Sequence, residues 1–313
     1  MRSAFVGDAV PVVRDGSQEI VMDDKKMQKR KRIIRHELTK FLFVVPVLCF
    51  FSFSILIPFL SGIEISFTNW DGFSAEKDFV GLKNYINFFT NPSVLRPIKN
   101  TVIYTILTTV LGNLTSLLFA LGINRNFKGR AFCRMAFFLP TAISMVLASF
   151  IWKYIFRDLF SQMFGIKNLL GQTSTVLLGL TLIHMWIDVG INMLVYLSSL
   201  QTIPKELLES AEIDGAGYWK RFFKVTLPMI VPAFTTCITL SITFGLKEFA
   251  LPFTATQGGP MDASVTIGMY IYNNLMSYKI AGYGQAVAII FAVAIVLISG
   301  FVSGTLRKKE VEF

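Results

Sequence analysis

Residues 209–228 read Glu209-Ser-Ala-Glu-Ile-Asp-Gly-Ala-Gly-Tyr-Trp-Lys-Arg-Phe-Phe-Lys-Val-Thr-Leu-Pro228, a polar and charged stretch between two strongly apolar segments. A helix-breaking pair, Asp214-Gly215, falls in the middle of this stretch. Leu227-Pro228 stands where the next apolar segment begins. The stretch therefore predicts a structured loop, with a turn at its centre, that joins two membrane spans.

The composition of the whole chain is that of a membrane protein. Of its 313 residues, 53% are hydrophobic and only 16% are charged, where a soluble domain carries about 25% charge. In such a protein the formal net charge of +10 is a topology signal rather than a nucleic-acid footprint. The three cysteines lie far apart, with neither metal-ligand spacing nor a disulfide framework. We expect no metal and no cofactor.

Apolar segments recur along the chain after residue 38, and each is close to the roughly 20 residues that cross a bilayer as a helix. Prolines such as Pro140 and Pro252 fall within them, which membrane helices tolerate where neighbouring helices satisfy the freed backbone groups. The fold class expected is an all-α polytopic membrane protein. Its six transmembrane helices are expected at about 39–61, 98–123, 131–156, 176–200, 228–256 and 282–305.

The basic residues predict the orientation. Most of the 30 Lys and Arg residues fall before the first span, after the last span, or in the segments 124–135 and 201–227. Because basic residues collect in cytoplasmic segments, both termini are expected inside the cell. The expected domains are a largely disordered basic tail without a cleavable signal peptide (1–38), a membrane domain (39–305) with a cytoplasmic loop (201–227), and a short C-terminal tail (306–313).

The loop itself predicts two short helices with a sharp turn between them. Pro204 can open the first helix, where its missing N–H costs nothing. Asp214 is the expected N-cap of a second helix over 216–225, and Gly215 provides the turn. Small side chains would let another protein approach closely: Ser210, Ala211, Gly215 and Ala216. The alternative is an ordinary amphipathic loop that lies on the membrane.

The same loop resembles the cytoplasmic coupling loop of binding-protein-dependent ABC importer permeases. That family's pattern is Glu-Ala-Ala, three residues, Gly, nine residues and Ile-x-Leu-Pro. Here it is matched by Glu209-Ser210-Ala211, Gly215 and Val225-Thr226-Leu227-Pro228, with mild departures at Ser210 and Val225. Similar permeases also carry counterparts of Val80–Tyr85, of the Phe137–Pro140 entry to the third span, and of the Gly258-Gly259-Pro260 turn.

The resemblance covers nearly all of residues 39–305, and the long form Ser199–Ala216 indicates the sugar branch, the maltose and multiple-sugar type. It implies a permease subunit in the bacterial plasma membrane, with ATPase-coupling residues Glu209, Ser210, Ala211, Asp214, Gly215 and Ala216. It also implies a second permease subunit, two copies of an ATPase subunit, an extracytoplasmic solute-binding protein and a sugar substrate. The chain itself has no phosphate-binding loop, so we expect no enzyme activity in it.

Polar side chains recur at helical spacing inside three spans. A stripe of this kind can line a pathway for a hydroxylated solute, or it can join helices through hydrogen bonds. A His-Asp pair also suggests a proton relay. The stripe in span two is Thr101, Thr105, Thr109 and Asn113. The candidate pathway residues are His184, Asp188 and Asn192 in span four and Thr239, Thr243 and Lys247 in span five.

Lys247 is the most informative of these candidates, because an ammonium inside a membrane needs a partner or water. On a continuous helix Glu248 points about 100° away from it, which leaves Asp188 as one candidate partner. Two other functions compete with an ATP-driven permease: a secondary transporter or channel driven by an ion gradient, and a membrane scaffold or sensor. The coupling loop favours the ATP-driven permease over these two functions, because neither of them involves an ATPase subunit that would bind such a loop.

Overall fold

The computed structural model describes residues 36, 40–165, 167–308 and 310. The chain divides into two units, Met1–Gly62 and Ile63–Phe313. The expected N-terminal tail, 1–38, lies outside the described residues except for His36. The first apolar segment forms a helical run from Lys40 to Ser66, which contains η1 (Ser52–Leu56) and α2 (Ile57–Ser66).

The second unit is helical almost throughout the part that the structure describes, and an isolated bridge joins Thr68 to Phe79. Its α-helices are α3 (Lys83–Thr90), α4 (Leu95–Ile123), α5 (Arg130–Phe138), α6 (Met145–Tyr154), α7 (Phe160–Phe164), α8 (Val176–Gln201), α9 (Lys205–Ile213), α10 (Tyr218–Arg221), α11 (Leu227–Met229), α12 (Val231–Leu246), α13 (Ile267–Tyr272) and α14 (Ala281–Arg307). Its 3₁₀ and π-helical turns are η2 (Pro92–Val94), η3 (Leu139–Ala142), η4 (Ile155–Leu159), η5 (Leu169–Gly171), η6 (Phe222–Thr226), η7 (Pro252–Thr256) and η8 (Asn273–Ser277).

Within the described residues, 4 helices are long and apolar enough to cross a membrane by themselves, and counting two bent pairs as one span each gives up to 6. The bent pairs correspond to the third and fifth expected spans, so these are not straight helices. Arg130–Ala142 and Met145–Phe164 meet at 103°, because Ile143 is extended and Ser144 caps a new helix by accepting a hydrogen bond from Leu147.

The fifth span differs from the expected 228–256 at both ends. Helix already begins at Tyr218 and bends by 67° between Met229 and Val231. It then ends at Leu246, ten residues earlier than expected, and a separate helical segment covers 250–256. The chain therefore breaks at residues 247–249, inside what the sequence presents as one apolar segment.

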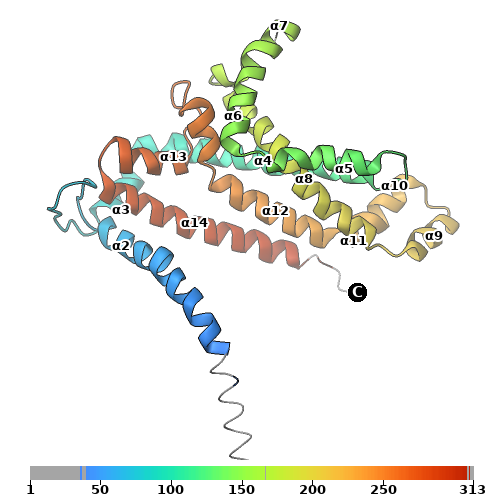
Figure 1. Cartoon of the computed structure of the whole chain (residues 1–313), viewed down its shortest axis with the longest axis horizontal. Coiled ribbons are helices and arrows are strands. Elements are labelled where there is room, and N and C mark those ends of the chain that lie inside the picture. The colour runs from blue at the N-terminus through green and yellow to red at the C-terminus, as the bar shows by residue number, and fades with distance from the viewer. Residues whose placement is uncertain (1–35, 37–39, 166, 309, 311–313) are drawn as a thin grey trace, which may run out of the picture. The chain divides into compact units, whose positions relative to one another are not determined.

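Helix α4 packs along α8 and α12, and α12 packs along α14 (Figure 1). Asn113 of α4 ties three helices together: it donates to Ser241 of α12 at 3.1 Å and accepts from the Tyr196 hydroxyl of α8 at 2.8 Å. Thr101 of α4 accepts from the backbone of Ile267. Asn113 and Thr101, at the two ends of the span-two stripe, thus hold other elements in place, as membrane hydrogen bonds commonly do.

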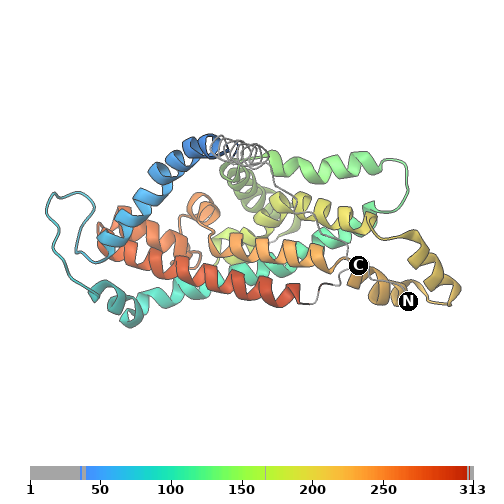
Figure 2. The ribbon, with the colours of Figure 1, turned by 90° about the horizontal axis from the view of Figure 1, so that it is seen from below.

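Helices α3 and α13 gather near one end of α4, and α9 lies at its other end (Figures 1 and 2). Helices α3 and α13 lie in segments that fall between the expected spans. A glycine permits one close approach there, because a Cβ on Gly282 would clash with the carbonyl oxygen of Thr68. The two ends of the second unit therefore carry different structures, a cap of short helices at one end and the predicted loop at the other.

Candidate functional site

The predicted loop forms a helix–turn–helix, which we call the elbow (residues 205–226). Pro204 precedes α9 as its N-cap with ψ 131, and Glu206 lies in the first turn, where an acidic side chain complements the helix dipole. At the other end of α9, Gly215 has φ 75, a left-handed conformation that glycine adopts without cost. The Ala216 N–H donates to the Ala211 carbonyl at 3.0 Å, which closes the helix as a Schellman motif does.

Asp214 has a different position from the one expected. It is the C-cap of α9 rather than the N-cap of the following helix, and that helix starts at Tyr218 with Gly217 as its N-cap. The reason is the left-handed glycine that follows Asp214: such a residue ends the helix before it instead of starting the next one. Helical backbone then continues through α10, η6 and α11 to Met229, well past the expected 225.

The tip of the elbow is apolar and exposed. Ile213 is 87% exposed and Trp219 68% exposed, although both are large hydrophobic residues. Glu212 and Arg221 form an ion pair that joins α9 to α10 behind this tip. Glu209, Ser210, Asp214 and Gly215 are exposed, while Ala211 and Ala216 are half-buried. Exposed large hydrophobic residues of this kind are common where one protein binds another.

A second candidate site lies inside the span region, between α8 and the break after α12. We call it the carboxylate pocket; it is a cavity of about 440 Å³. Its polar lining residues are His184, Asp188 and Asn192 of α8, Ser241 of α12, and Lys247 and Glu248 of the break. Its other walls include Ile191, Leu240 and Phe244. A largely apolar pocket with a few convergent polar groups is the usual form of a small-molecule site.

Glu248 stabilises the break between α12 and the helical segment 250–256. One carboxylate oxygen accepts a hydrogen bond from the backbone N–H of Leu251 at 2.9 Å, so this side chain caps the segment 250–256. Its backbone carbonyl accepts from the Thr266 hydroxyl at 2.7 Å, and its side chain is buried. The carboxylate therefore stabilises a helix start in the position where the sequence pattern predicts uninterrupted helix.

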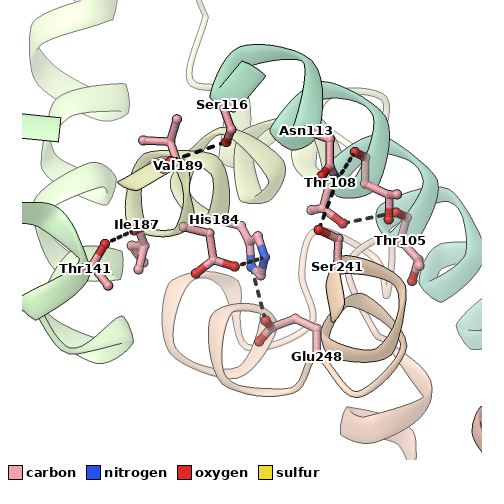
Figure 3. Close-up of polar contacts among 12 residues, drawn as sticks. Thr105, Thr108, Asn113, Ser116, Thr141, His184, Ile187, Val189, Ser241 and Glu248 are labelled. Carbon is pink, nitrogen blue, oxygen red and sulfur yellow. Dashed lines mark hydrogen bonds and ion pairs between the residues drawn. The ribbon is translucent and has the colours of Figure 1, made fainter. Parts of the chain in front are cut away.

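His184 lies between the two carboxylates of the pocket (Figure 3). Its Nε2 is 3.0 Å from Asp188 one turn along α8, and its Nδ1 is 3.6 Å from Glu248 across the pocket. The ring of Tyr104 meets the imidazole edge-on, with ring centroids 5.8 Å apart. A buried carboxylate is stable only with a partner, so the imidazole is what permits Asp188 and Glu248 to approach the same cavity.

The structure brings four of the six candidate pathway residues to this pocket and places the other two elsewhere. His184, Asp188, Asn192 and Lys247 line it. Thr243 instead bonds to the Thr239 carbonyl at 2.8 Å and to the Ser299 hydroxyl of α14 at 2.9 Å. Thr239 lines a separate cavity beside α14. Asp188 pairs with His184 rather than with Lys247, whose own side chain is exposed.

Glu248 is the site residue that sequence reasoning did not select. The helical pattern of Thr239, Thr243 and Lys247 turns Glu248 away from their face, and only the break redirects it. One signal for the break was available: Pro252 is tolerated in the first turn of a helix but not in its interior. Among the described residues, no group of three or more His, Cys, Asp or Glu side chains could hold a metal ion.

Residues 112–308 match the family of binding-protein-dependent transport system inner membrane components. The chain belongs to this family. It is therefore a multi-pass membrane protein of the permease type, and Gly112 to Lys308 includes both the elbow and the carboxylate pocket.

Several curated relatives are named as permeases for sugars. The probable starch degradation products transport system permease protein AmyD of Thermoanaerobacterium thermosulfurigenes is 31% identical over 91% of this chain and 100% of its own length. The arabinooligosaccharides transport system permease protein AraP of Bacillus subtilis is 31% identical over 83% of this chain and 85% of its own. The multiple sugar-binding transport system permease protein MsmF of Streptococcus mutans is 30% identical over 77% of this chain and 86% of its own length.

Solved structures share the fold. A chain of a bacterial ABC transporter involved in the import of the acidic polysaccharide alginate superposes with a TM-score of 0.76 and 22% identity, over 90% of this chain and 99% of that one. A chain of the bacterial alginate transporter, in complex with an alginate pentasaccharide-bound periplasmic protein, gives the same TM-score over 88% of this chain and 96% of that one. At this identity the likeness establishes the architecture alone.

Proposed function

We propose that this chain is one of two permease subunits of an ATP-driven importer of neutral sugars or oligosaccharides. A related second permease completes the pathway, two copies of an ATPase subunit bind on the cytoplasmic side, and an extracytoplasmic binding protein delivers the sugar. Family membership supports the permease role, and the relatives named for starch products, multiple sugars and arabinooligosaccharides support the substrate class.

The elbow carries the coupling part of the proposal. Its tip exposes Ile213 and Trp219 to the surroundings, and its two helices are tied by the Glu212–Arg221 pair. An elbow so braced moves as one body when a bound protein pushes on it. With both termini inside, the elbow faces the cytoplasm, where ATP is available. Since the chain has no phosphate-binding loop, hydrolysis falls to the separate subunit that docks there.

The carboxylate pocket supplies the pathway part. A sugar that leaves water must exchange its hydrogen bonds for others inside the membrane. Asn192, Asp188 and the exposed Lys247 offer donors and acceptors along one wall of the cavity. The break at 247–249 frees backbone groups next to the pocket, a feature that membrane proteins tolerate where irregular backbone lines a cavity.

Purification from native membranes in mild detergent tests the assembly. We expect a second permease and an ATPase subunit to co-purify with the chain. In proteoliposomes that also contain the binding protein, uptake of a labelled oligosaccharide should require ATP and should persist without an ion gradient. Uptake driven by an ion gradient without ATP would contradict the proposal and would support a secondary transporter.

A further inference from the structure

A second polar cavity lies at the end of α4 opposite to the elbow. It measures about 790 Å³ and is larger than the carboxylate pocket. The residues around it come from the segment 69–70, from α3 and η2, from the first turn of α4, from η8 and from the start of α14. With both termini inside the cell, this end of the molecule faces outward. Because of its lining we call it the asparagine cavity.

Asparagine is the most frequent residue in the lining: Asn69, Asn84, Asn87, Asn91, Asn273 and Asn274. Some of them hold the cavity together. Asn84 donates to the carbonyls of Ser66 and Thr68 at 2.8 Å, and Asn274 donates to the Tyr270 carbonyl at 2.7 Å. Asn87 of α3 and Asn273 of η8 have no side-chain hydrogen bond to any residue that the structure describes. Their amides are available to a ligand.

Hydroxyl groups extend the polar wall. The Tyr270 hydroxyl lies 3.1 Å from the Ser93 hydroxyl and 3.2 Å from the Tyr283 hydroxyl, and in each contact either oxygen can be the donor. Amides and hydroxyls of this kind both donate and accept, as the hydroxyl groups of a sugar do. A wall of such groups can therefore adapt to a polyhydroxylated ligand by rotating protons rather than by moving side chains.

The charges in the cavity are few. The Arg96 guanidinium is engaged, since it donates to the Met261 carbonyl at 2.7 Å. The Asp262 carboxylate is exposed to solvent. One cation and one anion leave the lining without a net charge, which disfavours an anionic ligand and favours a neutral one.

Aromatic rings complete the lining. Trp70 is fixed by its indole N–H, which donates to the Ser74 carbonyl at 2.8 Å, and the neighbouring Asp71 carboxylate accepts from the backbone of Phe73 and Ser74. These bonds lower the pKa of Asp71 to about 2, so its carboxylate stays charged and keeps accepting them well below neutral pH. Tyr278 is exposed at the rim. Such rings offer flat apolar faces beside the amides.

We propose that the asparagine cavity binds part of a neutral saccharide outside the membrane region, as a site separate from the carboxylate pocket. The inference rests on the proposed function, because a sugar must reach this end of the chain. The volume falls within the range of small-molecule sites, roughly 300–1,000 Å³. Amides and hydroxyls stand beside apolar and aromatic residues in this lining, a combination that suits the hydroxyl groups and the C–H faces of a sugar ring.

Binding to the purified complex, without its binding protein, tests the inference. The probe is the neutral trisaccharide that the complex imports fastest among maltotriose, raffinose and arabinotriose, followed by saturation-transfer NMR. Asn87→Ala together with Asn273→Ala should weaken the NMR-detected binding about tenfold, in line with the loss of two hydrogen bonds. Asn126→Ala, an asparagine near the elbow end, should bind as the unchanged complex does.

Three results would overturn the inference. The complex could import a trisaccharide but show no binding without the binding protein. The double variant could bind the trisaccharide as tightly as the unchanged complex. The double variant could instead weaken docking of the binding protein and leave trisaccharide binding intact, which would assign the cavity to a protein loop. Failure to import any of the three sugars would be a failure of the proposed function, and it is seen in the uptake assay itself.

Discussion

The elbow and the carboxylate pocket are built in different ways. The elbow depends on neighbours in sequence: Pro204 opens α9, Gly215 closes it, and one ion pair within nine residues joins its helices. The pocket depends on α4, α8 and the break after α12, which are joined through His184 and Glu248. A locally determined, exposed feature suits a docking element. A buried cluster assembled over a long stretch of the chain suits a site that must respond when helices move.

The largest effect is expected from Gly215→Pro in the elbow. Proline fixes φ near −65°, whereas Gly215 has φ 75 and donates its N–H to the Glu212 carbonyl. Uptake should fall to background while the chain still inserts, as measured by sugar uptake in cells and by the amount of chain in the membrane.

Gly217→Pro is the matched control, because Gly217 already has φ −62 and a Cβ there meets no atom within 4 Å. It should keep most of the uptake. If both proline variants transport equally well, the conformation of the turn does not matter and the elbow loses its proposed role.

The next effect separates charge from structure at Glu248. Glu248→Ala removes both the cap on Leu251 and the partner of His184, and breaking a buried pair of this kind costs about 3 kcal/mol. The yield of folded complex and its melting temperature should both drop. Glu248→Gln keeps an acceptor for Leu251 but not the charge that faces His184, so it should recover part of the melting temperature and none of the transport rate. Equal loss of folded complex in both variants would show that the negative charge of Glu248 is needed for folding or assembly.

A moderate effect is expected from Lys247→Ala. Lys247 is exposed in the pocket, so its removal should leave assembly unchanged and lower the initial rate of uptake about tenfold or more, since a hydrogen bond to a charged group contributes about 1.5–3 kcal/mol. Lys153→Ala on α6, an exposed lysine of another span, is the control. Parallel losses of complex and uptake would mark Lys247 as a structural residue.

The smallest effect is expected from Thr243→Val. Thr243 joins α12 to Ser299 of α14, and a bond between membrane helices is worth about 0.6 kcal/mol on average. Melting of the complex should shift slightly and uptake should not change. A clear loss of uptake with a normal melting temperature would show that Thr243 belongs to the transport pathway, as Asp188 and Asn192 are proposed to do.

The parts that the sequence predicted well are those with local chemistry. The segments at 98–123, 176–200 and 282–305 correspond to α4, α8 and α14 within a few residues, because hydropathy and length suffice for a straight span. The elbow was predictable because its helix start and its turn depend on residues within it, Pro204 and Gly215. Its one misassigned residue, Asp214, fails because aspartate suits both ends of a helix, and the left-handed glycine after it decides which.

The break at 247–249 could not be predicted in the same way. Thr239, Thr243 and Lys247 have the spacing of one continuous helix, and Pro252 alone argues against it without giving the position of the break. The break is fixed by the Leu251 backbone and by Thr266, 18 residues further along the chain from Glu248. Burial of Glu248 and its approach to His184 follow from this tertiary contact, so the carboxylate pocket became visible only in three dimensions.

The ratio of ATP hydrolysed to sugar imported tests most directly whether the elbow transmits motion and the pocket carries the sugar. It can be measured in proteoliposomes that hold the assembled complex and its binding protein. We predict that Gly215→Pro abolishes both import and the hydrolysis stimulated by the binding protein. Lys247→Ala should lower import while stimulated hydrolysis continues, so that more ATP is used per sugar. Normal stimulated hydrolysis in Gly215→Pro, or an unchanged ratio in Lys247→Ala, would contradict this division of roles.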